Sequence, residues 1–507
     1  MFTERVLDLT RQPDYFWALL PEIVLSLWAM LVLLVDVFQK GNRSIPSRPS
    51  IAWLSLAGLG VTALANAYLL RVTETAPNGM VAVDSFRVFV NFIFLLSAAL
   101  ALVLAAGYLD RKGINRGEFQ ALVLFSVVGM MLMASSRDLI LMFVGLEVMS
   151  LAIYVLVGFD REDPRSSEAA LKYFLLGAFS SAFFLYGIAL LFGASGSTHL
   201  SVIGPAVATA LEGGRPMVLA GTALTMIGLS FKVAAVPFHV WTPDAYDGAP
   251  TPVTALMSTG VKAAAFGAFI RVFSVALSGI RHEWIEVGFW IAALTMFGAN
   301  LIALTQGSLK RMLAYSSIAH AGYLLVALLS TNRAGGAAFL FYLLVYTLMT
   351  AGAFGVLIAN AREGADRVRL EDYAGFGWQR PFLAAAFSIF LLSLAGFPLT
   401  AGFLGKLYIL QAAMAADLEE LAILLVLASV ISYFYYLRVI VVMYMQPAKS
   451  DTEHAEARLP GAASFAVGAA AVAVVLLFFA PLPLGWADRS VAGLFEVAAP
   501  GMFGMVP

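Results

Sequence analysis

The sequence predicts an all-α polytopic membrane protein with about fourteen transmembrane helices, organised as two inverted five-helix repeats that each contain a broken helix. Of its 507 residues, 61% are hydrophobic and 12% are charged, and the mean hydropathy is +0.87. Soluble domains carry about 25% charged residues, so lipid must be the solvent for most of this surface. In addition, proline interrupts two apolar segments at matching positions of the chain.

A membrane-spanning helix needs about 20 mostly apolar residues. Windows of this kind divide the chain into fourteen spans, at 16–38, 51–70, 86–108, 119–136, 139–158, 168–193, 217–241, 251–275, 284–304, 311–330, 337–360, 381–412, 418–445 and 463–483. The loops between them are too short for a soluble domain. The N-terminal segment lacks a short apolar core before a small-residue cleavage site, so we expect the first helix to be retained.

The seventh and twelfth spans are the interrupted ones. Pro237 lies in VAAVPFHVWTPDAY, and Gly396 and Pro398 lie in SLAGFPLTAGFLGK. Proline removes an amide donor and clashes with the preceding turn, so both helices should kink or unwind. The two prolines are 161 residues apart, which matches five spans, and a repeat with an odd number of spans reverses its direction when duplicated. Such paired breaks point to a transporter's ion site, although membrane helices also tolerate proline without that role.

This repeat predicts four parts of the chain. Residues 1–117 hold the first three helices, 118–276 the first five-helix repeat, 277–445 the second, inverted repeat, and 446–507 the last helix and a tail. Sixteen lysines and arginines lie in the odd-numbered loops, against nine in the even-numbered loops and the termini. Basic loops stay in the cytoplasm, so both termini are predicted on the outer, periplasmic side of a bacterial inner membrane.

The charge balance and the cysteine count exclude several functions. A net charge of −1 argues against nucleic acid binding. With no cysteine, the chain cannot hold a thiolate-bound iron–sulfur cluster, so electron transfer is expected on another chain. The sequence contains no Walker loop, no metal-ligand cluster and no Ser/His/Asp arrangement.

Five ionisable side chains lie inside the apolar spans: Glu147, Lys172, Lys232, Lys262 and Lys406. An ionisable group at membrane depth costs at least roughly 2.5–3.5 kcal/mol, so each one is a functional candidate. Lysine suits proton transfer because it loses its proton readily when desolvated, whereas arginine stays charged. The set therefore suggests a path for a small cation, most simply the proton.

Glu147 lies in the middle of its span and must be protonated or paired. Lys232 comes five residues before Pro237, and Lys262 is near the centre of the next span. A Glu147–Lys232 pair that opens and closes would act as a proton gate. A permanent ion pair that joins two helices is the structural alternative.

Three further candidates complete the set. Lys172 follows Glu168 by four residues, the spacing of an ordinary helix-stabilising pair. Lys406 follows the second break by eight residues and could be a terminal proton donor that faces the outside. His320 lies in a polar strip and could relay protons near pH 7. That strip contains Tyr315, Ser316, Ser317 and Tyr323.

Two charged residues near helix ends, Arg87 and Glu22, are predicted to have structural roles. Arg87 begins its helix and is expected to snorkel to the membrane surface. Glu22, in the first turn of its helix, is expected to be favoured by the helix dipole.

With its central glutamate and its lysines on the seventh, eighth and twelfth spans, the chain resembles the antiporter-like subunits of respiratory complex I. Two segments, SSEAALKYFLLGA at 166–178 and FHVWTPDAY at 238–246, resemble the N-type subunit of the bacterial proton-pumping NADH:quinone oxidoreductase. The resemblance covers essentially the whole chain. Lys406 departs from the glutamate usual in the M-type subunit, and the tail after residue 483 is too short for the lateral helix of the L-type subunit.

The resemblance implies a proton relay through the membrane midplane, coupled to quinone reduction elsewhere in the complex. Its members would be Glu147, Lys172, Lys232, Lys262, His320 and Lys406. It also implies that this chain binds no cofactor or metal, and that NADH, FMN, iron–sulfur clusters and quinone are bound by other subunits. The implied partners are the bilayer, an M-type subunit on one side and the small K- and J-type subunits on the other.

Two alternatives remain open. Subunits of multisubunit sodium/proton antiporters share most of this core, but a sodium site should supply several oxygen ligands, and lysines outnumber carboxylates at membrane depth four to one. A non-pumping scaffold would require all the buried charges to be structural.

Overall fold

The computed structural model describes residues 5–9, 11–39, 49–74, 79–209, 214–361, 366–448 and 461–496. The α-helices are α1 (Gln12–Ala18), α2 (Leu20–Gln39), α3 (Pro49–Tyr68), α4 (Ser85–Arg111), α5 (Gly117–Ser135), α6 (Leu139–Val157), α7 (Pro164–Ser195), α8 (Leu200–Thr209), α9 (Arg215–Val233), α10 (Thr242–Gly248), α11 (Thr251–Leu256), α12 (Lys262–Arg271), α13 (Arg281–Ala303), α14 (Leu309–Leu329), α15 (Arg333–Asn360), α16 (Phe376–Gln379), α17 (Pro381–Ala395), α18 (Ala401–Met414), α19 (Glu419–Met445), α20 (Gly461–Phe479) and α21 (Leu482–Glu496). The remaining elements are strands β1 (Arg5–Leu7) and β2 (Val72–Glu74), 3-10 helices η1 (Leu69–Arg71), η4 (Ser278–Ile280) and η5 (Leu370–Tyr373), and π-helices η2 (Met257–Val261) and η3 (Val272–Ala276).

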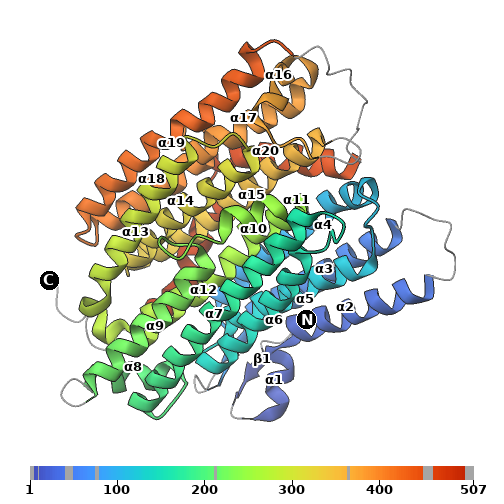
Figure 1. The fold of residues 1–507 in the computed structure, drawn as a ribbon. Helices are drawn as coiled ribbons and strands as arrows, with labels where there is room; N and C mark the ends of the chain where they lie inside the picture. The colour runs from blue at the N-terminus through green and yellow to red at the C-terminus, as the bar shows by residue number, and fades with distance from the viewer. Residues whose placement is uncertain are drawn as a thin grey trace.

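The long helices lie side by side, with α2 and α3 at one edge of the molecule and α19 at the opposite edge (Figure 1). Within the described residues, thirteen helices are long and apolar enough to cross a membrane. The twelfth predicted span is instead the pair α17 and α18. Each of the fourteen predicted spans therefore contains a helix, and the predicted fold class is confirmed.

Both helices that proline was expected to interrupt are broken. The first break separates α9 from α10, where Ala234 has φ of 63°, and the second separates α17 from α18, where Gly396 has φ of 86°. Side chains satisfy the backbone groups that the breaks release. The Trp241 indole donates to the carbonyl of Phe231 at 3.1 Å, and the Tyr433 hydroxyl donates to that of Gly396 at 2.9 Å.

The eighth span is also irregular. The π-helix η2 lies between α11 and α12 and ends at Val261, immediately before Lys262. π-helical turns are rare and occur often at functional sites. Nothing in the apolar pattern of this span predicted the π-helical turn η2.

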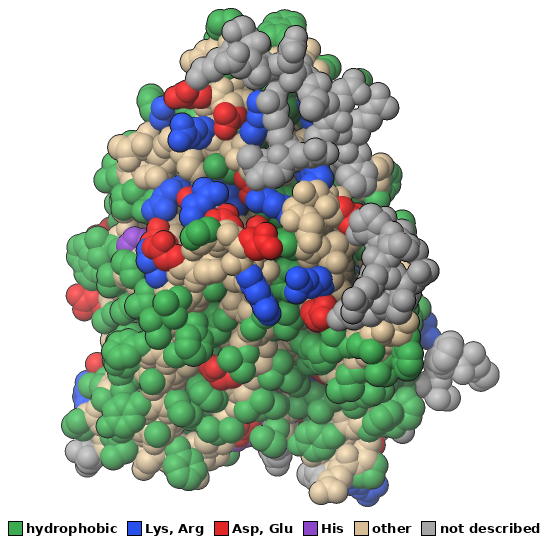
Figure 2. Space-filling model, turned by 45° about the vertical axis from the view of Figure 1, so that its right-hand side comes forward, with side chains coloured by type: hydrophobic (Ala, Val, Ile, Leu, Met, Phe, Trp, Pro, Cys, Tyr) green, Lys and Arg blue, Asp and Glu red, His purple; other side chains and the backbone are tan. Residues whose placement is uncertain are grey.

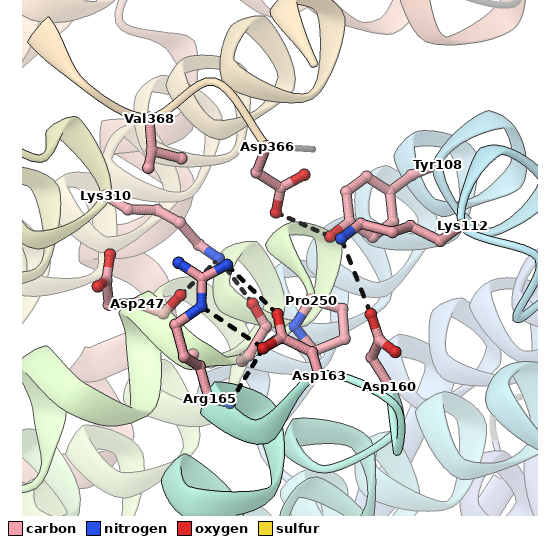
Figure 3. Close-up of a pocket in the computed structure, with 12 residues that line it drawn as sticks. Tyr108, Lys112, Asp160, Asp163, Arg165, Asp247, Pro250, Lys310, Asp366 and Val368 are labelled. Carbon is pink, nitrogen blue, oxygen red and sulfur yellow. Dashed lines mark hydrogen bonds and ion pairs between the residues drawn. The ribbon is translucent and has the colours of Figure 1, made fainter. Parts of the chain in front are cut away.

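Charged and hydrophobic side chains occupy different parts of the surface. Figure 2 shows a broad hydrophobic face with Lys, Arg, Asp and Glu side chains gathered in a band above it. We define the basic side as the end of the bundle that carries Lys112, Arg165, Lys310 and Arg311, where a small polar cavity lies between α4, α7, α10 and α14 (Figure 3). β1 pairs with β2, and Trp486 of α21 packs on Phe89 near the start of α4. Both ends of the described chain therefore lie at the side opposite the basic side.

The prediction that Arg87 snorkels is wrong, while Glu22 lies in the first turn of α2 as expected and is also the partner of Arg87. The Arg87 side chain is fully buried and its guanidinium donates to both carboxylate oxygens of Glu22 at 2.7 Å. It also donates to the carbonyl of Ala82 at 2.9 Å. Arg87 does not snorkel, because a buried carboxylate on α2 offers its charge a partner. The pair fixes α2 against α4.

Several short elements were not predicted. α8 occupies part of the expected loop 194–216, and α21 follows the last predicted span, in what was expected to be a tail. β1 and β2 form a short parallel pair. The predicted loops at 361–380 and 446–462, the loop after α2 and the end of the tail lie partly outside the described residues.

Candidate functional site

Lys232 is buried at the end of the first half of a broken helix. It is 2% exposed, and its Nζ donates to Ser150 Oγ at 2.8 Å and to the Tyr154 hydroxyl at 3.1 Å, both on α6. The rings of Tyr154, Tyr173 and Phe231 have their centroids 5.3, 5.7 and 5.9 Å from this nitrogen. Aromatic faces favour the ammonium form, while a hydroxyl can bond to either form of an amine. The described partners of Lys232 are therefore hydroxyl groups and aromatic rings.

Glu147 lies on α6 as predicted but makes no ion pair with Lys232 in this structure. Its carboxylate is half-buried and accepts a hydrogen bond of 2.5 Å from Ser181 on α7. Ser150, the partner of Lys232, comes three residues later on the same helix, so the two groups are near each other but directed to different neighbours. The predicted Glu147–Lys232 pair does not form in this structure.

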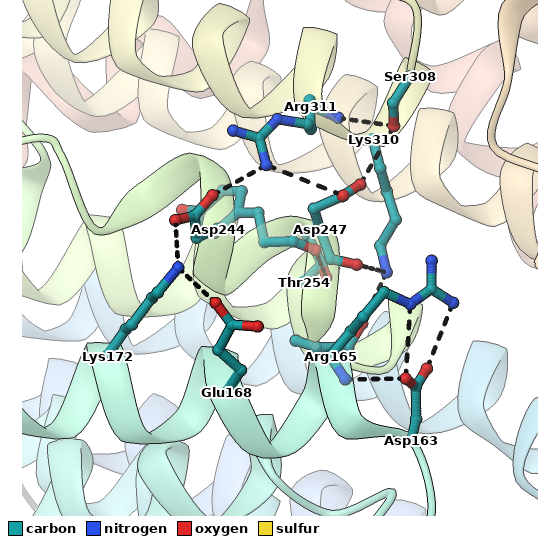
Figure 4. A network of polar contacts seen from close by, with 12 residues as sticks. Asp163, Arg165, Glu168, Lys172, Asp244, Asp247, Thr254, Ser308, Lys310 and Arg311 are labelled. Atoms are coloured by element: carbon teal, nitrogen blue, oxygen red, sulfur yellow. Dashed lines mark hydrogen bonds and ion pairs between the residues drawn. The ribbon is translucent and has the colours of Figure 1, made fainter.

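Lys172 is not buried, contrary to the expectation. Its side chain is 45% exposed and forms ion pairs with Glu168 at 2.7 Å and with Asp244 of α10 at 3.0 Å (Figure 4). The reason is its position near the start of α7, at the basic side, so the predicted Glu168 pair forms at the surface. Burial acts to raise the pKa of Asp244, but hydrogen bonds from Lys172 and Arg311 hold that pKa below its usual range.

Lys262 lies at the boundary between η2 and α12 and reaches across to α14. It is 2% exposed, and its Nζ donates to the Ser317 carbonyl at 2.5 Å and to Ser317 Oγ at 2.6 Å. Tyr346 of α15 donates to the same Ser317 Oγ at 2.8 Å. Ser317 therefore joins the Lys262 amine to a tyrosine of the second repeat.

His320, one turn beyond Ser317 on α14, lies within a cluster of tyrosines. Its Nδ1 is 2.6 Å from the Tyr342 hydroxyl and its Nε2 is 3.3 Å from the Tyr436 hydroxyl. The Tyr436 hydroxyl also bonds to Ser316. Ser316, from the predicted polar strip, thus lies beside these tyrosines, and the histidine has a hydroxyl partner on each ring nitrogen.

Lys406 lies in the second half of the second broken helix. It is 6% exposed, and its Nζ donates to the carbonyl of Ala395 at 2.9 Å, so it satisfies the last turn of α17. The same nitrogen lies 4.5 Å from the centroid of the Tyr323 ring. A Cβ on Gly396 would come within 2.9 Å of the Lys406 Cδ. The glycine thus provides both the φ of 86° that ends α17 and the space through which the lysine passes.

The predicted residues fall on a continuous series of helices. Lys232 links α9 to α6, α9 packs on α12, Lys262 links α12 to α14, and α14 packs on α18, which carries Lys406. Among the residues that the structure describes, Lys232, Lys262 and Lys406 have hydroxyl, carbonyl or ring partners and no carboxylate partner. The polar partners of these three amines in this structure are therefore neutral groups.

Sequence reasoning missed the hydroxyl groups that connect these amines. They are Ser150, Tyr154, Tyr342, Tyr346 and Tyr436. Ser150 with Tyr154, and Tyr342 with Tyr346, are spaced by four residues, which places each pair on one helix face. That repeated polar spacing inside apolar helices was the available signal.

Within the described part of the chain, no three His, Asp or Glu side chains are grouped so that they could hold a metal ion. The described side chains around the buried amines are hydrogen-bond donors and acceptors. Hydrogen-bonded amines, hydroxyls and an imidazole can pass protons between neighbours.

Comparisons with known proteins agree with this arrangement. A family model described as "NADH:quinone oxidoreductase/Mrp antiporter, TM" matches residues 136–432. NADH-quinone oxidoreductase subunit N of Trichlorobacter lovleyi is 45% identical over 89% of this chain and 92% of that protein. NADH-quinone oxidoreductase subunit N 1 of Sorangium cellulosum is 47% identical over 94% of this chain and 98% of that protein.

A solved structure of respiratory complex I from Thermus thermophilus with bound aureothin contains a similar chain. That chain is 37% identical, superposes with a TM-score of 0.76, and is matched over 93% of this chain and 100% of its own length. Each of these three likenesses covers 89% or more of this chain. The chain therefore belongs to the NADH-quinone oxidoreductase subunit N family, the antiporter-like membrane-arm subunits of complex I.

Proposed function

We propose that this chain translocates protons across the membrane as part of an NADH:quinone oxidoreductase, driven by redox chemistry on other subunits. The observation that carries the proposal is the series of buried amines, Lys232, Lys262 and Lys406, each hydrogen-bonded to neutral groups. A purely structural subunit would not need buried amines that lack a carboxylate partner. Each such amine is costly at membrane depth, which favours a role in proton transfer.

The relay begins at Glu147 and Lys232 and passes through Lys262 and His320 to Lys406. When Glu147 leaves Ser181 and approaches Lys232, it stabilises the ammonium form, and when it withdraws it favours the neutral amine and release of the proton. Hydroxyl groups connect Lys262 with the surroundings of His320. Lys172, exposed beside Asp244, exchanges protons with solvent at the edge of this path.

The proposal extends to the surroundings of the chain. The basic side faces the cytoplasm and both termini face the periplasm of a bacterial inner membrane. The repeats comprise 118–276 and 277–445. An M-type subunit lies on one side and K- and J-type subunits on the other, and NADH, FMN, iron–sulfur clusters and quinone are bound elsewhere in the complex.

The test is proton pumping by the assembled complex in inverted membrane vesicles, measured per NADH oxidised. Lys232→Ala or Lys262→Ala should lower the proton yield at least about tenfold, the scale of losing a proton-transfer group. Native gels establish that the variant complexes assemble. A normal yield from assembled Lys262→Ala complex would refute the proposal, and a yield that depends on sodium would favour the antiporter alternative.

A further inference from the structure

A cavity of about 270 Å³ lies at the end of the bundle opposite the basic side. Its walls come from η1 and β2, from the start of α4 and from the last turns of α21, so we name it the α21 cavity. The apolar side chains that line it are Leu69, Leu70, Val72, Val83, Val88 and Leu494. Pockets for small ligands start at roughly 300 Å³, so this cavity has room for a headgroup but not for a whole lipid.

Aromatic side chains pack around the walls of the α21 cavity. Four of its apolar lining residues belong to a small hydrophobic cluster that is separate from the main core. Trp17, Tyr68 and Trp486 pack against this cluster. Tryptophan and tyrosine are enriched at the membrane–water interface, at the level of the lipid headgroups. We therefore place the cavity at headgroup depth.

Two adjacent residues of α21 give the cavity donors for an anion. Arg489 is exposed, and among the described residues no carboxylate forms an ion pair with it. Ser490 also lines the cavity, is 3% exposed, and its hydroxyl has no hydrogen-bond partner in the described part of the chain. Buried hydroxyls usually have a partner, and a phosphate oxygen in the cavity would supply one.

Asp84, the residue before α4, adds a negative charge to the lining. Its Oδ1 accepts from the backbone N–H of Arg87 at 2.8 Å and from the Arg271 guanidinium at 2.8 Å. Its Oδ2 has no described hydrogen-bond partner, and the side chain is 29% exposed. Burial acts to raise the pKa of Asp84, but the charge of Arg271 and the N–H of Arg87 hold that pKa below its usual range. The carboxylate is therefore ionised at neutral pH.

We propose that the α21 cavity binds the headgroup of a phospholipid that carries both a phosphate and a primary ammonium, as phosphatidylethanolamine does. The phosphate accepts hydrogen bonds from Arg489 and Ser490, and the ammonium donates to Asp84 Oδ2. Such charge-assisted hydrogen bonds are the strong ones. The acyl chains leave along the apolar lining, where Leu70 is 51% exposed. This inference does not depend on proton translocation.

A soluble phosphate compound and a segment of a neighbouring subunit are the competing occupants. A soluble phosphate would use the donors of α21 but would leave the apolar walls without a partner. A protein segment would need more room than a cavity of about 270 Å³ gives. A lipid headgroup uses both charges and continues into an apolar tail, so it matches the whole lining.

The experiment labels the assembled complex with a photoreactive phospholipid. The vesicles consist of phosphatidylcholine, whose quaternary ammonium cannot donate a hydrogen bond, with a trace of phosphatidylethanolamine or phosphatidylglycerol that carries a diazirine near the glycerol. Mass spectrometry quantifies the labelled peptides from 69–88 and 489–494. We expect phosphatidylethanolamine to label both segments and phosphatidylglycerol, which has no amine for Asp84, to label them at least about fivefold less.

Two variants test the cavity itself, and native gels establish their assembly. Arg489→Gln removes the charge and should lower labelling by phosphatidylethanolamine at least about tenfold. Gly493 lines the cavity, and a Cβ there would have no neighbouring atom within 4 Å, so Gly493→Trp can fill the space without a clash and should block labelling. Arg11→Gln is the matched control, because Arg11 is exposed but does not line the cavity. Asp84 is left unchanged, since its loss would leave the buried Arg271 without its ion pair.

Native labelling of both Arg489→Gln and Gly493→Trp would overturn the proposal, and so would equal labelling by the two lipids. An unlabelled native complex would also overturn it, because a neighbouring subunit would then cover the cavity. Soluble glycerophosphoethanolamine provides the last arm. Loss of labelling when it is added would identify a soluble compound as the occupant and overturn the lipid site, whereas labelling that persists would support it.

Discussion

The two repeats hold their amines in different ways. In the first repeat, Lys232 contacts Ser150 and Tyr154 of α6, the helix that also carries the half-buried Glu147. In the second repeat, Lys406 and His320 are surrounded by tyrosines and carbonyls. As with Lys232, no described carboxylate pairs with Lys406.

The two kinds of surroundings suit two different roles in proton transfer. Under the proposed function, Glu147 would change the proton affinity of Lys232 by approaching or leaving it, so the first repeat would act as a switch. Hydroxyl groups can both donate and accept hydrogen bonds, so the second repeat would act as a conductor. The following variants test that division, from the largest expected effect to the smallest.

Gly396→Ala should damage the second repeat most. The new Cβ would come within 2.9 Å of the Lys406 Cδ, and the φ of 86° would cost a left-handed alanine about 1–2 kcal/mol. We expect proton yield per NADH to fall about tenfold or more, because small displacements of a reacting group carry large rate penalties. Gly113→Ala is the matched control, since Gly113 also has a positive φ, of 69°, but an added Cβ there would have no neighbouring atom within 4 Å. Equal losses in the two variants would show that backbone strain, not Lys406, is responsible.

Tyr342→Phe tests the conductor at His320. It removes the hydroxyl that lies 2.6 Å from Nδ1 and keeps the ring. Loss of one hydrogen bond should lower the proton yield about threefold to tenfold. Tyr373→Phe is the control, because Tyr373 is equally buried and its hydroxyl donates to the carbonyl of Arg367, at the basic side. A native yield from Tyr342→Phe would exclude this tyrosine from the path.

Ser181→Ala tests the switch in the first repeat. It removes the hydroxyl that holds Glu147 at 2.5 Å and so frees the carboxylate to approach Lys232. We expect a change of about threefold in pumping rate, consistent with one hydrogen bond, and a larger loss with Glu147→Gln, which removes the charge itself. If both variants pump at the native rate, Glu147 is not a switch.

Lys172→Gln should have the smallest effect. Lys172 is exposed, so solvent can supply protons in its place, and we expect pumping to change by no more than about twofold. Asp244 has a lowered pKa, so its pairing with Lys172 and Arg311 is fully present at neutral pH. That pairing is lost only as the pH falls through the lowered pKa, below about 4. A tenfold lower pumping rate in Lys172→Gln vesicles near pH 7 would show that Lys172 is a necessary member of the relay.

The sequence was sufficient to predict the spans, both helix breaks and the burial of Lys232, Lys262 and Lys406, because each follows from a local rule. Apolar length determines the spans, and Pro237 and Gly396 determine the breaks. The burial of Lys172 could not be judged from its segment alone, since a long helix such as α7 extends beyond the apolar core.

The partners of the amines depend on tertiary packing and were not predictable in the same way. Ser317 meets Lys262 across two helices, and Tyr436 approaches His320 from a third. Lys310 follows a short loop and reads as an ordinary surface cation until the fold buries it. Glu22 and Arg87 are 65 residues apart in sequence, so their ion pair could be found only in three dimensions.

Replacement of Lys262 by arginine tests the central claim most directly. Arginine keeps a positive charge beside Ser317 but does not release its proton at the pH of the cell. If protons pass through the buried amine, Lys262→Arg complex should assemble, oxidise NADH and yield as few pumped protons as Lys262→Ala. A native proton yield from Lys262→Arg would contradict the account, because it would mean that a permanent charge at this position is enough.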